Sequence, residues 1–167
     1  MKDHKLNIRR ISTEEEKTAC ADIMAGSEPW TTLGIYMDHI MDILRNPLHE
    51  VFAAYVKEEI VGTMVIHTKG AFPAYLKSIA IKPSWRDQNV GEQMMDHIEN
   101  EIFSTYKNLF LCVSSFNLEA QDFFLKLGYE QIGELKDYLV EDHDEILMRK
   151  TIAPLLERDR LKKNSPY

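Results

Sequence analysis

The residues best suited to chemistry in this chain form a short polar turn between an apolar strand and an amphipathic helix. The apolar run Leu76–Ile81 stops at Pro83, and the turn Arg86–Gly91 follows. Apolar residues then recur at helical spacing, namely Met94, Met95, Ile98 and Ile102. A helix entered through such a turn directs several unpaired N–H groups and its positive dipole end at one point. This arrangement suits a phosphate or pyrophosphate; the alternative is an ordinary strand–loop–helix connection.

Length and charge limit the class of protein. A chain of 167 residues is expected to form one domain, here residues 1–150, with 151–167 as a tail of short helix and frayed end. The net charge of −7 argues against a nucleic-acid-binding surface. No stretch approaches the roughly 20 apolar residues that span a bilayer, and the charged start predicts no secretory signal.

The two cysteines, Cys20 and Cys112, lie far apart and show no ligand-like spacing. We expect two reduced thiols and a cytoplasmic location. The six histidines form no metal-binding pattern, so no metal is expected. A monomer or a homodimer is equally compatible with the sequence.

The hydrophobic pattern predicts a mixed α/β fold. Strands are expected at Leu6–Ile11, Val51–Val56, Ile60–His67, Leu76–Ile81, Leu109–Val113, Tyr129–Val140 and Glu145–Lys150. Helices are expected from a capping box at Ser12 and Glu15 to about Ala25, from about Ile35 to Arg45, after Gly91, and from an Asn117 cap to Gly128. This order implies a mixed, mostly antiparallel sheet flanked by helices, with a binding site where two neighbouring parallel strands end.

Two motifs resemble those of the GNAT superfamily of acetyl-CoA-dependent N-acyltransferases. The first is Arg86–Gly91, between a strand and a helix, where the family has Arg or Gln, two residues, Gly, one residue, and Gly or Ala. The second comprises Asn117, Ala120, the aromatic pair Phe123–Phe124, and Gly128–Tyr129. The order and separation of the two motifs match the family, and the element order agrees from the first strand to the last.

The closing hairpin adds a narrower likeness. Gly133, Tyr138, Asp144 and the segment Leu147–Lys150 resemble peptide and ribosomal-protein amino-terminal acetyltransferases.

The resemblance implies acetyl-CoA as cosubstrate. The main chain of the strand before the turn would pair with the pantetheine arm, and one N–H there would polarise the thioester carbonyl. The turn amides would hold the pyrophosphate. The cofactor-binding residues implied in this way are Ile79, Ala80, Ile81, Arg86, Asp87, Gln88, Asn89, Val90, Gly91, Glu92, Asn117, Phe124 and Lys126. An Asn at position 117 could also be present only to cap the following helix, and Lys126 could be a solvated surface residue that binds no phosphate.

The turn departs from the family pattern at Asn89, which stands where the first Gly is usual. Asn is the residue other than Gly that best tolerates the left-handed backbone region, so the turn is expected to survive. The side chain of Asn89 adds bulk and that of Asp87 adds negative charge, which is expected to weaken cofactor binding.

The catalytic positions depart further. The family commonly has a proton-donating Tyr where this chain has Phe124. Its amino-terminal acetyltransferases often have a carboxylate that deprotonates the amine on the strand where this chain has Cys112. Cys112 is either an acyl-accepting nucleophile or a small filler of the central strand.

Other residues could supply the proton transfers. The hydroxyl of Ser114 or Ser115 could relay a proton, and a base could come from Glu28, His67 or Tyr138. The acceptor pocket is expected to include Glu28, Trp30 and Tyr138, although Trp30 also fits a core position.

The sequence therefore predicts an N-acetyltransferase that moves an acetyl group from acetyl-CoA to a primary amine by direct transfer in a ternary complex. The acceptor is left open between a small molecule, such as an antibiotic, and a peptide or protein amine. The alternative, which Phe124 and Cys112 favour, is a catalytically weakened CoA or acyl-CoA sensor or interaction module. A mononucleotide-binding module unrelated to CoA is a third interpretation.

Overall fold

The computed structural model describes residues 5–156, which form a seven-stranded sheet in the order β1-β2-β3-β4-β5-β7-β6. The strands are β1 (Asn7–Arg10), β2 (His49–Val56), β3 (Glu59–His67), β4 (Tyr75–Ile81), β5 (Asn108–Ser114), β6 (Glu130–Val140) and β7 (His143–Thr151). All neighbouring pairs are antiparallel except β4 and β5. The predicted mixed α/β fold is confirmed.

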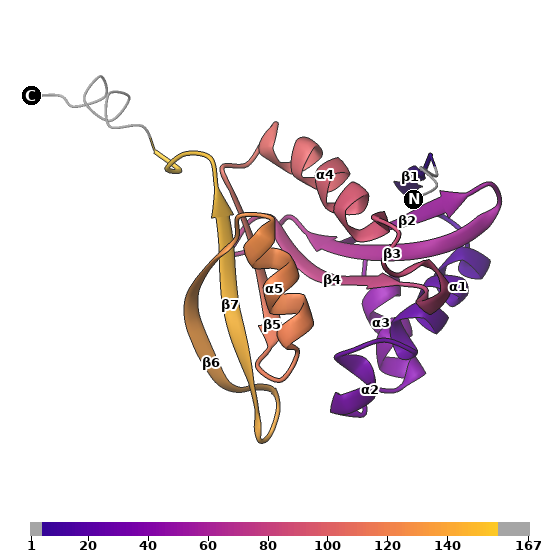
Figure 1. Ribbon diagram of the computed structural model, residues 1–167, viewed down its shortest axis with the longest axis horizontal. Helices are drawn as coiled ribbons and strands as arrows, with labels where there is room; N and C mark the ends of the chain where they lie inside the picture. Colours follow the sequence, from indigo (N-terminus) through magenta and orange to yellow (C-terminus); the bar gives the residue numbers. More distant parts are fainter. Residues whose placement is uncertain (1–4, 157–167) are drawn as a thin grey trace, which may run out of the picture.

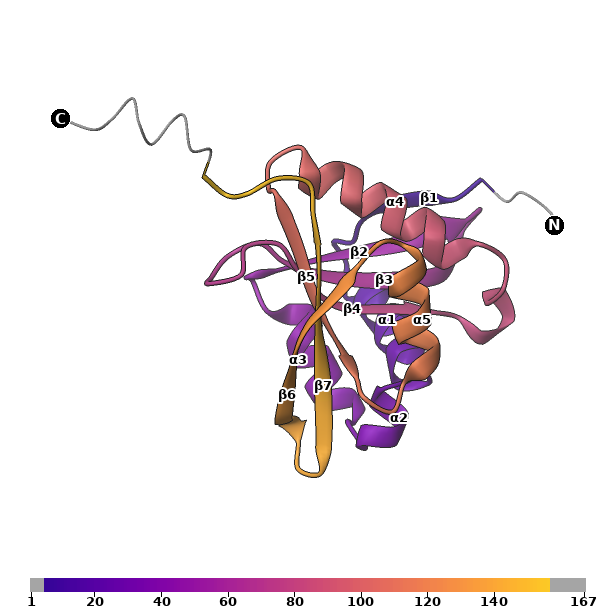
Figure 2. The same cartoon turned by 60° about the vertical axis from the view of Figure 1, so that its left-hand side comes forward.

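Helices cover both faces of the sheet. They are α1 (Glu14–Ala25), α2 (Trp30–Leu33), α3 (Met37–Arg45), α4 (Val90–Phe103) and α5 (Leu118–Lys126), with a 3-10 turn η1 (Pro83–Trp85) after β4. Helix α4 lies on the opposite side of the strands from α1, α2 and α3 (Figures 1 and 2). Each face buries its own apolar cluster, one centred on Met94 and Leu109 and the other on Met24 and Ile40.

Helix α3, the short helix α2 and the segment after β7 differ from the prediction. Helix α3 begins at Met37 rather than near Ile35, and the four-residue α2 was not predicted because one turn shows no periodicity. Residues 152–156 form bends instead of starting a helix, and the remainder of the predicted tail, 157–167, lies outside the described residues. Within 5–156, no helix is long and apolar enough to cross a membrane.

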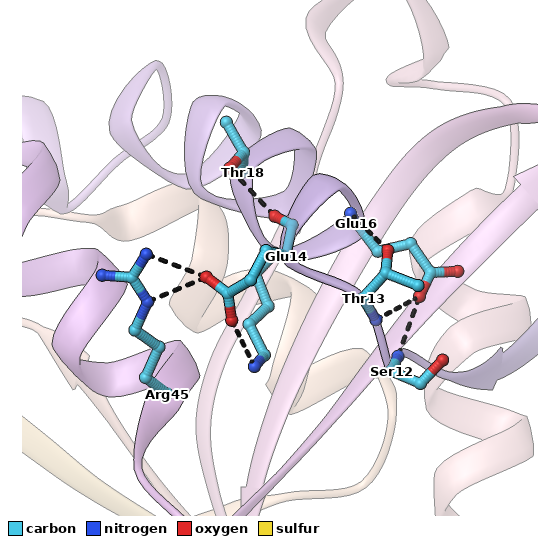
Figure 3. A network of polar contacts seen from close by, with 7 residues as sticks. Ser12, Thr13, Glu14, Glu16, Thr18 and Arg45 are labelled. Atoms are coloured by element: carbon cyan, nitrogen blue, oxygen red, sulfur yellow. Dashed lines mark hydrogen bonds and ion pairs between the residues drawn. The ribbon is translucent and has the colours of Figure 1, made fainter.

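A capping box opens α1, one residue later than predicted. Thr13, not Ser12, is the N-cap, and its hydroxyl accepts the N–H of Glu16 at 3.1 Å. The Glu16 carboxylate in return accepts the N–H groups of Ser12 and Thr13, at 2.8 and 3.0 Å (Figure 3). The Arg45 guanidinium donates twice to Glu14 and so ties α3 to the first turn of α1.

The Glu16 carboxylate supports a prediction about acid stability. Hydrogen bonds from the Ser12 and Thr13 amides and the Tyr55 hydroxyl, with a further bond from Arg9, lower its pKa to about 2. Because the pKa is lowered in the folded state, the charged carboxylate contributes its full stabilisation at pH values above the ordinary carboxyl pKa. This stabilisation is lost as the pH falls toward 2. We expect Glu16→Gln to lower the free energy of unfolding by about 1 kcal/mol at pH 7, or ~2–4 °C in Tm.

Thermal unfolding at a series of pH values measures the effect of Glu16→Gln and that of a control variant. The exposed neighbour Glu15, changed to Gln, should leave Tm within ~1 °C. The difference between Glu16→Gln and wild type should shrink as the pH approaches 2. An equal loss at all pH values would contradict the assigned role of the charge.

The sheet opens between its two central strands. Strands β4 and β5 pair only at Tyr75–Phe110 and Leu76–Leu111. Beyond Leu76, β4 pairs only with β3, and the end of β5 pairs only with β7. The strands β2–β4 and β5–β7 accordingly run in clearly different directions (Figure 1).

A β-bulge lies on β4 at the start of this opening. Val65 pairs with Ser78 and Ile66 with Leu76, so Lys77 is the extra residue. A bulge shifts the alternation of side chains between the two faces. Leu76 and Ile79 therefore both pack against the cluster under α4, whereas Ala80 belongs to the cluster under α1.

Candidate active site

The turn before α4 has the backbone that the sequence predicts. Asn89 is the N-cap of α4 and adopts the left-handed conformation, with φ 61° and ψ 21°. Asp87 also has a positive φ, 57°. The Asn89 side chain makes no capping hydrogen bond, so the first N–H groups of α4 are not covered by it. Asn in place of Gly has thus kept the geometry of an anion-binding helix start.

Arg86 fixes this turn to its surroundings. Its Nε donates to the carbonyl of Ile81 at 3.3 Å, and its terminal nitrogen donates to the Ser27 hydroxyl at 3.2 Å. The side-chain amide of Gln88 donates to the carbonyl of Ser84 at 2.9 Å. These hydrogen bonds hold both side chains against the turn and its neighbours.

A cavity of about 280 Å³ lies between this turn, the end of β4 and α5. The predicted cofactor residues that line it are Ile79, Ala80, Ile81, Arg86, Asp87, Asn89, Val90, Gly91, Glu92, Asn117 and Phe124. Gln88 and Lys126 do not line it, because the first is bonded to the preceding turn and the second is exposed in the last turn of α5. We refer to this space as the donor cavity.

A second cavity, of about 210 Å³, opens on the other side of the gap between β4 and β5. Its lining includes the predicted acceptor and catalytic residues Glu28, Trp30, Cys112, Ser114 and Tyr138. We refer to it as the acceptor cavity. The two cavities share the lining residues Glu28, Ile79, Asn117, Ala120 and Phe124, so they meet where the sheet opens.

The helix α5 forms the common wall. Asn117 accepts the N–H of Ala120 through its side-chain oxygen at 3.2 Å, which is the predicted cap. Phe124 is only 4% exposed and packs edge-on against Tyr129 and Phe123, with ring centroids 5.4 and 5.1 Å away. Phe124 is therefore a packed apolar wall that offers no proton.

Glu145 is the main residue that the sequence analysis missed. It lies near the start of β7, pairs with Ser114 of β5, lines the acceptor cavity and is 2% exposed. The Ser114 hydroxyl donates to its Oε1 at 2.5 Å. Burial raises the pKa of this carboxyl, and the Ser114 hydrogen bond opposes the rise in part.

Tyr75 is the second missed residue of the acceptor cavity. Burial raises the pKa of its phenol, and the nearby Cys112, Tyr138 and Glu145 raise it further. Burial likewise raises the pKa of the Cys112 thiol. Both groups thus stay protonated near neutral pH, so Cys112 fits a packed neutral thiol better than a thiolate nucleophile.

The other predicted candidates lie at the rim or elsewhere. Glu28 is exposed and accepts hydrogen bonds from the N–H and hydroxyl of Thr32. Burial raises the pKa of Glu28, but hydrogen bonds from Thr31 and Thr32 outweigh it, and the pKa is lowered. Tyr138 is 56% exposed.

His67 and Ser115 line neither cavity. His67 instead stacks edge-on with His49, with ring centroids 5.4 Å apart. In the described part of the chain, no three His, Cys, Asp or Glu residues are placed to hold a metal ion.

Comparison with known proteins decides the family. Residues 11–129 match the model of the Acetyltransferase (GNAT) family. The chain belongs to this family. The family match includes both of the motifs that predicted it.

A curated relative and two solved structures agree with this assignment. The chain is 28% identical over 106 residues to N-alpha-acetyltransferase 50 of Danio rerio; the match covers 59% of this chain and 63% of that protein, less than two thirds of its length. The ribosomal-protein-S18-alanine N-acetyltransferase of Escherichia coli has the same fold, with a TM-score of 0.70, 16% identity and coverage of 92% and 98% of the two chains. A GNAT acetyltransferase of Elizabethkingia anophelis with acetyl-CoA bound gives a TM-score of 0.70 at 16% identity, covering 90% of this chain and all of the other.

Proposed function

We propose that this chain is an N-acetyltransferase that moves an acetyl group from acetyl-CoA directly to a primary amine within a ternary complex. The observation that carries the proposal is the meeting of two cavities at the open edge of β4. Ile79, Asn117 and Phe124 line both cavities, so a thioester reaching this point from one side would face an amine on the other.

The donor cavity suits coenzyme A in its shape and its backbone groups. The start of α4 offers N–H groups and a positive dipole end to a pyrophosphate. The edge of β4 beyond Leu76 has no ladder partner on the β5 side, so an extended pantetheine arm could pair with it as an added strand. The acetyl-CoA complex of the Elizabethkingia neighbour supports the choice of donor.

Direct transfer is supported by the state of the acceptor cavity. An acyl-enzyme route would need a nucleophile near the thioester, and Cys112 is the cysteine there. Since burial raises the pKa of its thiol, little thiolate is present at neutral pH. The free thiols of Cys20 and Cys112 also fit the cytoplasmic location that belongs to this proposal.

The acceptor is an amine, and the names of two similar proteins favour an amine on a polypeptide. One is an N-alpha-acetyltransferase and the other acts on an alanine of a ribosomal protein. The acceptor cavity is also large enough for a small amine. Peptides and small amines therefore both belong in the test.

Thermal unfolding with acetyl-CoA, followed by an assay of free thiol release with an amine panel, tests the proposal. Acetyl-CoA at about 100 times its Kd should add about 2.7 kcal/mol, or ~5–10 °C in Tm, while ATP should add little. Stabilisation by ATP but not by acetyl-CoA would favour the mononucleotide module. Acetyl-CoA binding without thiol release from any amine would favour the sensor.

A further inference from the structure

We infer that Glu145 is the carboxylate that receives the acceptor amine, binds its ammonium form and takes its proton, and that the acceptor carries no carboxylate next to this amine. This inference rests on the proposed function and identifies a catalytic residue and a substrate class for it.

Glu145 is a buried acid that makes no ion pair with Lys or Arg in the described residues, and the nearby His143 offsets the effect of burial on its pKa only in part. The residue is 2% exposed. Ser114 donates one hydrogen bond, to Oε1. A carboxylate oxygen pair can accept about four, so Oε2 keeps its capacity for a further donor.

A buried carboxylate of this kind is costly for folding. Removing an ionised carboxyl from water is unfavourable unless a cation or several donors replace the lost hydration. The groups Tyr75 and Cys112 beside Glu145 are neutral, and the exposed Lys77 that also lines the acceptor cavity forms no ion pair with it. Burial therefore raises the pKa of Glu145, with the Ser114 hydrogen bond and His143 opposing the rise in part. An arriving ammonium group would supply the missing charge and donors.

The position of Glu145 relative to the two cavities assigns it to the amine. Glu145 lines the acceptor cavity and does not line the donor cavity. The residues common to both cavities, including Ile79 and Phe124, mark where the thioester would meet the amine. An ammonium group bound to Glu145 would therefore lie on the side of this point that faces away from coenzyme A.

The charges of the cavity also restrict the acceptor. The lining of the acceptor cavity includes two acids, the buried Glu145 and the exposed Glu28, together with the exposed Lys77 and with His39. Apolar side chains also line the cavity, among them Trp30, Ile35 and Leu139. A second carboxylate on the carbon that bears the amine would lie beside Glu145 in an apolar space, where like charges repel strongly. Free amino acids are thus disfavoured, and amines with an apolar body are favoured.

The Glu145 carboxylate takes one proton from the bound ammonium, and the neutral amine attacks the thioester carbonyl carbon. The C–N bond forms, the C–S bond breaks, and the thiolate takes the second nitrogen proton and leaves as coenzyme A. The proton on Glu145 then returns to solvent, so each turnover releases one proton.

The first test is Glu145→Gln, which keeps the shape of the side chain and removes its charge. We expect kcat/KM for the amine to fall at least ~100-fold, the usual lower bound for a general base, while the Kd for acetyl-CoA changes less than ~2-fold. Glu145→Asp keeps a carboxylate and should recover part of the rate. Glu134→Gln, an exposed change on the adjacent strand β6, is the matched control and should match wild type.

The pH profile separates a proton acceptor from a structural residue. Three titratable groups interact electrostatically with Glu145, namely Tyr75 on β4, Cys112 on β5 and His143 on β7. The other charged or titratable residues that line the acceptor cavity are Glu28, His39, Lys77 and Tyr138. Wild type should gain activity as the pH rises through the carboxyl pKa, which burial raises. Glu145→Gln should lose this rise, and Glu145→Asp should keep it.

The second test is a matched pair of acceptors, phenylalaninamide and phenylalanine, with acetyl-CoA as donor. Wild type should prefer the amide at least ~10-fold because the acid adds a negative charge beside Glu145. Phenethylamine and a tetrapeptide with a free amino terminus then distinguish a small amine from a polypeptide amine.

Each outcome decides between the proposals. The inference would be overturned if wild type turns over these amines and Glu145→Gln changes kcat/KM by less than ~3-fold. It would also be overturned if wild type prefers phenylalanine to its amide. Either result would keep the proposed function. Acetyl-CoA binding with no turnover of any of these amines would overturn the acceptor class. A wild-type protein that does not bind acetyl-CoA would overturn the proposed function as well.

Discussion

A Gly91→Glu variant is expected to bind acetyl-CoA at least ~100-fold more weakly than wild type while it keeps its fold. Gly91 is the second residue of α4 and lines the donor cavity. A Cβ there would meet the Phe123 ring at 3.2 Å, so the new side chain has to extend toward the cavity. Its carboxylate would occupy the position proposed for the pyrophosphate and would repel it; a loss of about 2.8 kcal/mol already gives the 100-fold change.

Isothermal titration with acetyl-CoA measures this effect. The fold should survive because an acidic side chain in the first turn of a helix interacts favourably with the dipole. Gly133→Glu is the matched control, since a Cβ at Gly133 meets nothing within 4 Å and the residue lies on β6, away from both cavities. Undiminished binding by Gly91→Glu would show that the pyrophosphate is held elsewhere.

A Leu111→Ala variant is expected to lose about 2–5 kcal/mol of stability, or ~5–15 °C in Tm. Leu111 is 1% exposed in the central strand and pairs with Leu76 on β4 and with Met148 on β7. The pair with Leu76 is the last one before the sheet opens. Truncation therefore leaves a cavity in the core at the place where only two residue pairs join β4 to β5.

Urea denaturation measured by circular dichroism checks this prediction. Leu118→Ala is the control, because Leu118 is 67% exposed in the first turn of α5 and its truncation should cost less than ~0.5 kcal/mol. Equal losses in the two variants would mean that the contact across β4 and β5 adds little to stability. A fall in acetyl-CoA affinity for Leu111→Ala alone would further link this contact to the donor cavity.

The features that the sequence predicted well depend on residues close together in the chain. The positive φ of Asn89 and the cap at Asn117 each follow from the chemistry of one turn. The error at α1 is local too, because Ser12 and Thr13 each have a Glu three residues later. Contacts of Glu16 with Tyr55 and Arg9 favour the capping box of Thr13 and Glu16 over the one that begins at Ser12. Neither contact is visible in the local sequence pattern.

The features that the sequence did not predict depend on pairing between distant strands. Glu145 is buried because β7 pairs with β5 in a register that sets it beside Ser114, 31 residues earlier. Tyr75 precedes the apolar run of β4, and its place in the acceptor cavity depends on the pairing with Phe110. An acid at the start of a strand is usually solvated, so no local pattern distinguishes Glu145 from the exposed acids of the same hairpin.

The opening between β4 and β5 has a consequence for the lifetime of the protein. Beyond Leu76 the β4 backbone has no strand partner on the side of β5. A donor that pairs there would form hydrogen bonds with the folded state and none with the unfolded chain. A ligand at 1,000 times its Kd protects the folded state by about 4.1 kcal/mol, which lowers the unfolded fraction roughly 1,000-fold. Proteases that act on the unfolded chain would then remove it more slowly when acetyl-CoA is plentiful. The gap in the sheet would thus tie the abundance of the protein to the supply of its proposed donor.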